Sequence, residues 1–201
     1  MIGIIDYGLG NIKAISNIYN KLKIKNFIIK KSEDFEMAER LILPGVGAFD
    51  SAIRNLKERD IFEKVNFLVL EKKTKILGIC VGMQTFAKLS EEGELDGLNW
   101  IPGNVKKFIY HDNLRLPHMG WNSVKKVKDN LLFKDIDNLE YFYFCHSYYY
   151  DSQDKNNVIT ETNYSSNFAS SINFNNIYGI QFHPEKSHDN GIKILKNFAE
   201  L

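Results

Sequence analysis

Cysteine is scarce in this chain of 201 residues, which holds only Cys80 and Cys145. Two cysteines do not make the disulfide framework of a small secreted protein, so we expect a reducing compartment, the cytoplasm. Proline is also rare, with four residues, and no Pro- or Ser-rich linker divides the chain. Together with the length, this predicts a single domain over residues 1–201.

An excess of either charge is missing, since 26 Lys and Arg against 25 Asp and Glu leave a net charge of +1. The sequence therefore lacks the basic bias of a nucleic-acid-binding protein, and we expect no such partner. No apolar run approaches the ~18 residues of a membrane span. Asp6 follows directly on the apolar residues 1–5, so we expect neither a secretory signal nor a membrane partner.

Short apolar runs alternate with helical patterns in the first half of the chain. Strands are expected at 2–5, 26–29, 40–43 and 75–79, and helices at 11–23, 49–58, 61–71 and 83–89. This alternation predicts an α/β fold with an open, mostly parallel or mixed sheet flanked by helices. The second half is richer in β patterns, at 98–127, 140–150 and 158–181, before a last helix at 191–199. Active sites in such sheets lie at the carboxyl ends of strands.

The most distinctive motif is Gly78-Ile79-Cys80-Val81-Gly82, a turn between an expected strand and an expected helix. It is the cysteine form of a nucleophile elbow. At the mouth of a helix, free N–H groups and the helix dipole favour a thiolate, and the two glycines permit a tight turn and leave room for a substrate. The alternative interpretation is a small buried cysteine beside turn glycines.

A base for this thiol is available near the end of the chain, at His183. Pro184 restricts His183 to an extended backbone, in which residues i and i+2 point to the same side. We therefore expect Glu185 to reach the His183 ring and orient it. Cys80, His183 and Glu185 are thus candidates for nucleophile, base and orienting acid. A surface His-Pro-Glu turn is the alternative.

Two glycine-containing turns follow expected strands. The turn at 6–11 lacks the third glycine of a dinucleotide-binding turn, so a turn that faces a ligand or partner is favoured, with Asn11 as a helix N-cap. The turn at 44–47 frees the backbone N–H groups of Val46 and Gly47, which together with that of Val81 can form an oxyanion hole. A plain tight turn is the alternative.

Two further segments are rich in aromatic residues. In 117–122, Met119 and Trp121 flank a glycine, either as surface anchors for a protein partner or as core residues. Most aromatic residues of 141–150 are expected in the core, with Cys145 as an inert buried thiol.

Histidine adds two more alternatives. His146 competes with His183 as the base, since the local pattern does not exclude it. A metal site from His183, Glu185 and His188 matches no standard zinc spacing, so we expect no metal, and we expect no other cofactor.

Taken together, these motifs resemble those of class I, triad-type glutamine amidotransferases. The resemblance rests on the elbow at 78–84 and on the segment 181–187, Gln-Phe-His-Pro-Glu-Lys-Ser. It narrows to the glutaminase subunits of imidazole glycerol phosphate synthases through 6–11, 44–47, 117–122 and 146–148. It covers the whole chain and implies a flavodoxin-like α/β fold.

The resemblance implies roles for individual residues. Cys80 attacks the side-chain amide of L-glutamine and forms a γ-glutamyl thioester, while His183, held by Glu185, protonates the departing ammonia and then activates water. The implied oxyanion hole is formed by Val46, Gly47 and Val81. The positions that hold glutamine are Gly47, Gln84, Ser147 and Tyr148. The positions on the partner face are Asn11, His118, Met119, Trp121, Asn122, Tyr143 and Lys186.

The resemblance also implies a partner, a (β/α)8-barrel cyclase that forms a heterodimer with the glutaminase. Ammonia passes into the barrel core without meeting bulk water and yields imidazole glycerol phosphate and an aminoimidazole carboxamide ribonucleotide, a step of histidine biosynthesis. Proteins that look like this subunit also serve other synthases, so the same chemistry feeding a sugar amidotransferase is one alternative. A non-catalytic α/β binding protein and a stand-alone cysteine hydrolase are two others.

Overall fold

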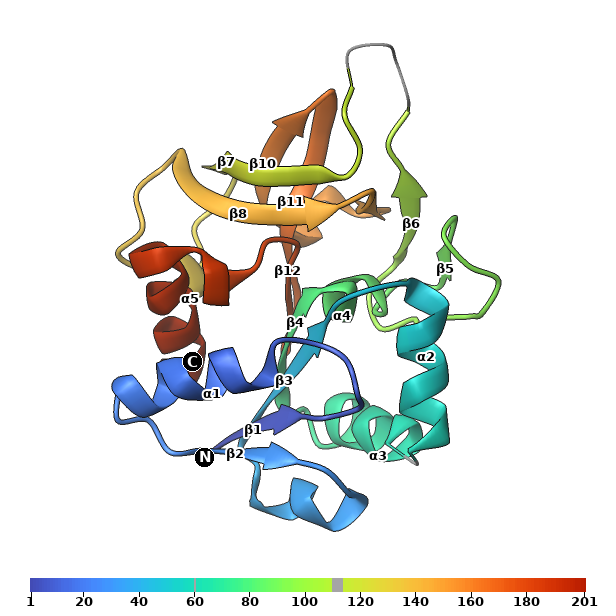
Figure 1. Ribbon diagram of the computed structural model, residues 1–201, viewed down its shortest axis with the longest axis vertical. Coiled ribbons are helices and arrows are strands. Elements are labelled where there is room, and N and C mark those ends of the chain that lie inside the picture. Colours follow the sequence, from blue (N-terminus) through green and yellow to red (C-terminus); the bar gives the residue numbers. More distant parts are fainter. Residues whose placement is uncertain (60, 110–113) are drawn as a thin grey trace.

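A mixed β-sheet runs through the molecule in the computed structural model, which describes residues 1–59, 61–109 and 114–201 (Figure 1). Its strands follow the order β2-β1-β3-β4-β12-β11-β10-β7-β8. Neighbours from β2 to β12 are parallel, and neighbours from β12 to β8 are antiparallel. The predicted α/β fold with a mixed sheet and a β-rich second half is therefore confirmed.

The strand bounds are β1 Ile2–Ile5, β2 Asn26–Ile29, β3 Arg40–Gly45, β4 Lys75–Cys80, β5 Leu89–Ser90, β6 Gly103–Lys107, β7 His118–Lys126, β8 Glu140–His146, β9 Tyr148–Ser152, β10 Val158–Tyr164, β11 Ser166–Phe174 and β12 Ile177–Ile180. The helix bounds are α1 Ile12–Lys21, α2 Phe49–Glu58, α3 Phe62–Asn66, α4 Val81–Gln84 and α5 His188–Glu200. Shorter helical turns are η1 Ser32–Met37, η2 Phe67–Glu71, η3 Leu131–Phe133, η4 Lys155–Asn157 and η5 Pro184–Lys186.

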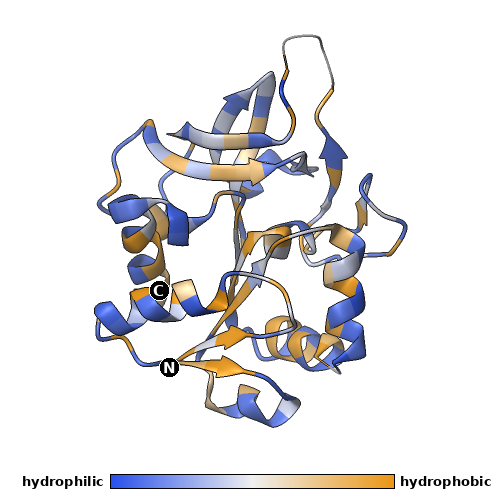
Figure 2. Cartoon of the chain, viewed as in Figure 1, coloured by the Kyte–Doolittle hydropathy of each residue, from blue (hydrophilic) through white to orange (hydrophobic). Residues whose placement is uncertain are grey.

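Helices cover both faces of the parallel half of the sheet (Figure 1). On one face α1 packs against α5, and the Tyr19 hydroxyl donates a hydrogen bond to the Leu195 carbonyl between them. On the other face α2 contacts α3. The strands between these layers are mainly apolar (Figure 2). β1 is buried at every position, and β3 and β4 are buried at every position after Arg40 and Lys75, because a parallel strand inside the sheet is covered on both sides. None of the helices in the described ranges is both long and apolar enough to cross a membrane.

The helix expected at 83–89 is wrong in extent, since α4 is a single turn that ends at Gln84. The chain after it turns away because a returning segment binds its carbonyl groups. The carbonyls of Thr85 and Ala87 accept hydrogen bonds from the N–H groups of Leu98 and Asn99. A tertiary contact therefore overrides the helical pattern of the sequence.

Other boundaries differ less. The helix expected at 61–71 is α3 followed by the π-helical η2, and α5 begins at His188 rather than at 191. The β pattern at 98–127 contains β6 and β7, while its residues 110–113 lie outside the described ranges. The β patterns at 140–150 and 158–181 each break at turns into separate strands.

Candidate active site

Cys80 ends β4 in a strained backbone conformation, with φ of 55° and ψ of −114°. L residues rarely adopt a positive φ, and such strain is typical of functional sites. The residue opposite Cys80 on β3 is Gly45, so the 44–47 turn begins beside the nucleophile. The Cys80 residue is 2% exposed. The sulfur is thus held at the carboxyl end of a central strand, as predicted.

Glycine in the elbow serves packing rather than substrate access. A Cβ on Gly82 would lie 2.0 Å from the Leu43 carbonyl oxygen, and one on Gly78 would lie 2.5 Å from the Phe86 ring. The expectation that these glycines leave room for a substrate is therefore wrong, because the space is filled by β3 and by Phe86. Since α4 is only one turn long, its dipole also contributes little to the site.

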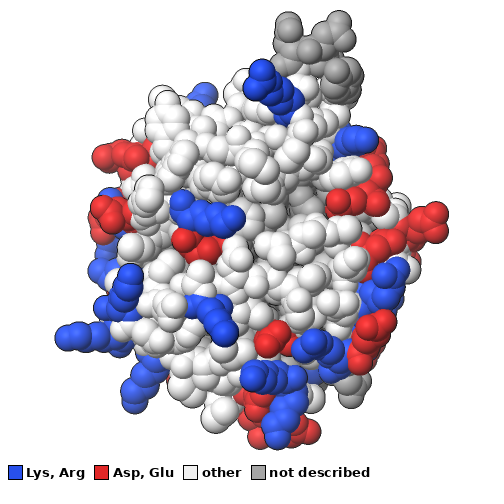
Figure 3. Space-filling model, in the orientation of Figure 1, with Lys and Arg blue, Asp and Glu red and all other residues white. Residues whose placement is uncertain are grey.

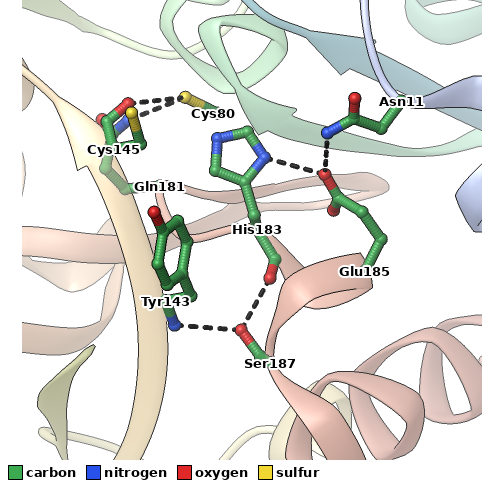
Figure 4. Close-up of polar contacts among 8 residues, drawn as sticks. All are labelled: Asn11, Cys80, Tyr143, Cys145, Gln181, His183, Glu185 and Ser187. Atoms are coloured by element: carbon green, nitrogen blue, oxygen red, sulfur yellow. Dashed lines mark hydrogen bonds and ion pairs between the residues drawn. The ribbon is translucent and has the colours of Figure 1, made fainter. Parts of the chain in front are cut away.

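His183 and Glu185 lie beside the nucleophile and are linked to Asn11 (Figure 4). His183 Nδ1 is 2.9 Å from Glu185 Oε1, and the side chains of the two residues are only 4% and 2% exposed. Asn11 Nδ2 donates a second hydrogen bond to the same oxygen over 2.7 Å. Glu185 Oε2 is buried without a hydrogen-bond partner among the described residues. The carboxylate is thus held by one histidine and one amide.

The sequence argument for this contact is only half right. His183 is extended, with φ of −96° and ψ of 102°, as its place before Pro184 predicts. Glu185, however, lies in the 3₁₀ turn η5 rather than in an extended segment. Asn11 was expected to cap α1, yet its side chain makes no capping hydrogen bond. Its amide binds Glu185 instead.

The electrostatics of the site favour a charged His183. Burial alone would lower its pKa, but the charge and hydrogen bond of Cys80, followed by the hydrogen bond and charge of Glu185, raise the pKa of His183 to about 10. Burial raises the pKa of Glu185, yet its bonds to His183 and Asn11 bring that pKa below its ordinary value. Figure 4 shows the His183 ring between the sulfur and the carboxylate. The arrangement therefore suits a positively charged imidazolium ring beside the sulfur.

The backbone of His183 is fixed to β8. Its N–H donates to the Tyr143 carbonyl over 2.9 Å. Ser187 Oγ donates to the His183 carbonyl over 2.6 Å and accepts from the Tyr143 N–H over 3.0 Å (Figure 4). The ring position is therefore set by the sheet and by η5 together.

A cavity of about 190 Å³ opens next to the sulfur. This is smaller than the ~300–1,000 Å³ of sites for drug-sized ligands, and it suits a substrate the size of one amino acid. It is lined by Asn11, Val46, Gly47, Cys80, Val81, Gln84, Glu92, Cys145, His146, Ser147, Tyr148, His183 and Lys186. All the residues predicted for the triad other than Glu185, for the oxyanion hole and for substrate binding are among them.

Glu92 is the pocket residue that the sequence analysis missed. Its Oε2 accepts a hydrogen bond from the Phe49 N–H, and burial raises its pKa above the ordinary value. Glu92 lies in a loop after β5, with no motif around it. Only the folded chain brings this carboxylate to the cavity.

Gln84 and Gln181 form a buried amide pair under the cavity. Gln84 Nε2 donates to the Tyr148 carbonyl over 2.8 Å and to Gln181 Oε1 over 3.0 Å. Both N–H groups of Gln84 are then used, so its Oε1 is the atom left for a ligand. Gln181 Nε2 lies 3.6 Å from Cys80 Sγ, and the Cys80 thiol is 3.9 Å from the Cys145 carbonyl.

The residues predicted for a partner face divide into exposed residues and buried or half-buried ones. Met119 and Trp121 are 61% and 45% exposed, so the interpretation of both as core residues is wrong. Trp121 stacks on the His188 ring at 4.9 Å between centroids. Lys186 is exposed and its Nζ lies 5.4 Å from the centre of the Tyr143 ring.

His118, predicted for the same face, is buried and points to another role. Asn122 is half-buried. Cys145, expected as a buried thiol, is half-buried and lines the cavity. Most aromatic residues of 141–150 are in the core or half-buried, but Tyr141 is exposed, because β8 alternates between the core and the surface.

The alternatives at the site find little support in the geometry. His146 does not bind Cys80, because both its ring nitrogens are bound to other groups, and burial with the nearby His118 lowers its pKa to about 3. His188 stacks on Trp121 rather than joining His183 and Glu185. Within the described residues, no group of three His, Cys, Asp or Glu side chains is placed to hold a metal ion.

Comparison with known proteins gives a consistent result. The family model for glutamine amidotransferase class-I matches residues 3–201. A protein from Leptospira borgpetersenii named imidazole glycerol phosphate synthase subunit HisH is 47% identical, and one of the same name from Bdellovibrio bacteriovorus is 45% identical, with 100% of both chains covered in each case. A solved structure named glutamine amidotransferase has a TM-score of 0.77 at 17% identity and covers 100% of this chain and 99% of its own.

Proposed function

The chain belongs to the class I glutamine amidotransferases, which are glutamine-hydrolysing enzymes, and we propose that it is the glutaminase subunit of an imidazole glycerol phosphate synthase. The observation that carries the chemistry is the strained Cys80 with His183 and Glu185 beside it. The pathway is supported by full-length relatives that bear this subunit's name. The reducing cytoplasm is the expected compartment, because both cysteines are free.

In the proposed reaction, the Cys80 thiolate attacks the side-chain carbonyl carbon of L-glutamine. The oxyanion is stabilised by backbone N–H groups of the 44–47 turn and of Val81. His183 gives its proton to the departing ammonia, which leaves a γ-glutamyl thioester. His183 then takes a proton from water, whose oxygen attacks the thioester and releases glutamate, and Glu185 stabilises the charged ring throughout.

The charged groups of glutamine fit the cavity in one orientation of the substrate. Glu92 is the acidic side chain among those that line it, and we assign to Glu92 the α-ammonium group of the substrate. Gln84 offers its free carbonyl oxygen, while Ser147 and Tyr148 line the same cavity. Glu92 is thereby added to the four predicted binding positions, Gly47, Gln84, Ser147 and Tyr148.

The proposed partner is a (β/α)8-barrel cyclase that covers the mouth of this cavity. Asn11 and Lys186 line the cavity and reach its rim, while the exposed Met119 and Trp121 supply apolar anchors. Figure 3 shows that the surface over β7 and β8 carries few charged side chains, as expected for the centre of an interface. A covered mouth passes ammonia to the barrel while it is still unprotonated and nucleophilic.

Glutamate release with and without the cyclase tests this proposal. The cyclase loaded with its nucleotide should stimulate the chain strongly, and Cys80→Ala should abolish the activity while leaving binding intact. Trp121→Ala should weaken binding without unfolding the protein, since the ring is half exposed. Should a folded chain neither bind the cyclase nor respond to it, another synthase, such as a sugar amidotransferase, becomes the leading candidate partner.

A further inference from the structure

A line of hydrogen bonds joins two buried histidines to the glutamine pocket. His118 on β7 faces His146 on β8 in the strand pairing, and the distance from His118 Nδ1 to His146 Nε2 is 3.0 Å. His146 Nδ1 lies 2.8 Å from the Tyr148 carbonyl oxygen. At the other end, Asn122 Nδ2 lies 3.1 Å from His118 Nε2. All four ring nitrogens therefore have a partner.

The donor and the acceptor of every hydrogen bond in this line follow from the groups at its two ends. A carbonyl oxygen only accepts, so His146 Nδ1 carries a proton and donates it to Tyr148. Burial lowers the pKa of His146 to about 3 and that of His118 to about 4, so both rings are neutral at pH 7. His146 Nε2 must then accept from His118 Nδ1, and His118 Nε2 must accept from Asn122.

The orientation of Asn122 agrees with this direction independently. Its Nδ2 also donates to the Asn163 carbonyl over 2.9 Å, and its Oδ1 accepts from the Ser123 N–H over 2.8 Å. The amide group is therefore fixed by the backbone, with its N–H groups toward His118. The same direction results whether the line is followed from Asn122 or from Tyr148.

Aromatic rings immobilise the two histidines. The His118 ring is parallel to that of Tyr164 at 3.9 Å and to that of Phe144 at 4.8 Å, and the ring of Phe108 lies 5.4 Å from that of His146. Fully satisfied polar networks of this kind make a buried segment rigid. What they make rigid here is the bend between β8 and β9, at Ser147 and Tyr148.

We propose that His118 and His146 are positioning residues of the glutamine pocket, holding the Tyr148 carbonyl in place through a one-way line of hydrogen bonds that starts at Asn122. This inference rests on the proposed function, because it takes glutamine as the ligand of the cavity. The Tyr148 carbonyl also accepts from Gln84, whose amide in turn orients Gln181 toward the sulfur. Its position therefore decides how the wall of the pocket meets the substrate.

The line begins on the partner side of the molecule. Asn122 is the neighbour of the exposed Trp121 on β7, the strand that also carries Met119. A partner that shifts this strand would shift the first member of the line. The pocket and the proposed interface are thus joined by groups with defined donors and acceptors rather than by apolar packing alone.

Substitutions at His146 separate the hydrogen bond from the packing. His146→Leu removes the donor to Tyr148 and should raise KM for glutamine about tenfold in the complex with the cyclase. His146→Asn keeps an N–H near the place of Nδ1 and should bring KM back to within about threefold of wild type. Phe108→Leu is the matched control, since it loosens the same cluster without breaking the line.

Alkylation of Cys80 by iodoacetamide provides a readout that does not depend on the binding of glutamine. Its rate, followed by mass spectrometry of the Cys80 peptide, should change less than about twofold in His146→Leu, because the triad is not touched. Equal increases in KM for His146→Leu and Phe108→Leu at equal loss of Tm would mean that packing alone holds the pocket, and the proposal would be wrong.

Nitrogen NMR of the two rings tests the line without any activity. Both His118 and His146 should be neutral with the proton on Nδ1 at pH 7. A proton on Nε2 of either ring would contradict the direction derived above. Because this measurement needs only the folded chain, absence of glutaminase activity in the wild-type complex would refute the proposed function and leave the hydrogen-bond line to be judged separately.

Discussion

Replacing Asn11 tests whether a residue at the start of α1 supports the triad. Asn11 Nδ2 donates to Glu185 Oε1 over 2.7 Å, and His183 is the other side chain bound to that oxygen. Because Glu185 Oε2 has no hydrogen-bond partner among the described residues, Asn11→Ala would leave the carboxylate with the His183 bond as its one remaining side-chain contact. The His183 ring would then be held less firmly while it carries charge.

The expected size follows from the chemistry of the bond. A hydrogen bond to a charged group contributes roughly 1.5–3 kcal/mol, which would correspond to about 10- to 100-fold if all of it were felt in the transition state. Only the part that strengthens when His183 is charged affects the rate, so we expect kcat/KM to fall about tenfold. The pKa of Glu185 should rise toward its ordinary value, which moves the acid limb of the pH–rate profile to higher pH.

The assay is glutamate release at saturating cyclase, so that weaker partner binding does not affect the rate. Asn11→Ser keeps a residue type that is favourable before a helix but is too short to reach Glu185, and it should lose as much activity as Asn11→Ala. Lys13→Ala, an exposed change on the same turn of α1, is the control and should retain activity. Full activity in Asn11→Ser would refute the reasoning, since the hydrogen bond from Asn11 to Glu185 would then not be needed for the rate.

Four further substitutions test the stability of the fold. Tyr7→Phe removes a buried hydroxyl that donates to the 44–47 turn over 2.7 Å, and it should lower the free energy of unfolding in urea by about 1–3 kcal/mol. Gly82→Ala should yield no folded protein, because its Cβ meets a backbone oxygen at 2.0 Å. Gly47→Ala meets nothing within 4 Å and should fold with a cost of about 1–2 kcal/mol for its φ of 91°. The pKa of Glu185 is lowered by folding, so its stabilising effect is present above its unfolded pKa and is lost as pH falls through the folded one. The difference in unfolding free energy between wild type and Glu185→Gln should therefore shrink on acidification, and a constant difference would contradict the assigned bonds.

The parallel half of the fold was predictable because its strands are short, mainly apolar and separated by amphipathic helices. The elbow was predictable as well, because Gly78 and Gly82 on either side of Cys80 indicate a tight turn. The length of the helix after it was not, because the bonds from Leu98 and Asn99 to the carbonyls of Thr85 and Ala87 join segments that have no common pattern. Local periodicity carries no information about such returning segments.

The site shows the same limit. The residues next to Cys80 and His183 in the sequence indicate their chemical roles, and the structure brings the two side chains together. Glu92 lies in a loop with no motif, and its carboxylate reaches the cavity only because Phe49 binds it from the start of α2. Asn11 has the features of an ordinary cap, and its bond to Glu185 spans 174 positions of sequence. Pairings over that distance follow from the topology of the sheet rather than from residue type.

Partner-dependent glutamine hydrolysis through Cys80 is the central claim, and glutamate release tests it most directly. The purified wild-type chain should be nearly inactive alone and strongly stimulated by a nucleotide-loaded cyclase barrel. The Cys80→Ala variant should be inactive even with that barrel. Equal activity of wild type and Cys80→Ala would contradict the assignment of the nucleophile. A folded wild-type chain that the loaded cyclase neither binds nor stimulates would contradict the assignment to imidazole glycerol phosphate synthase.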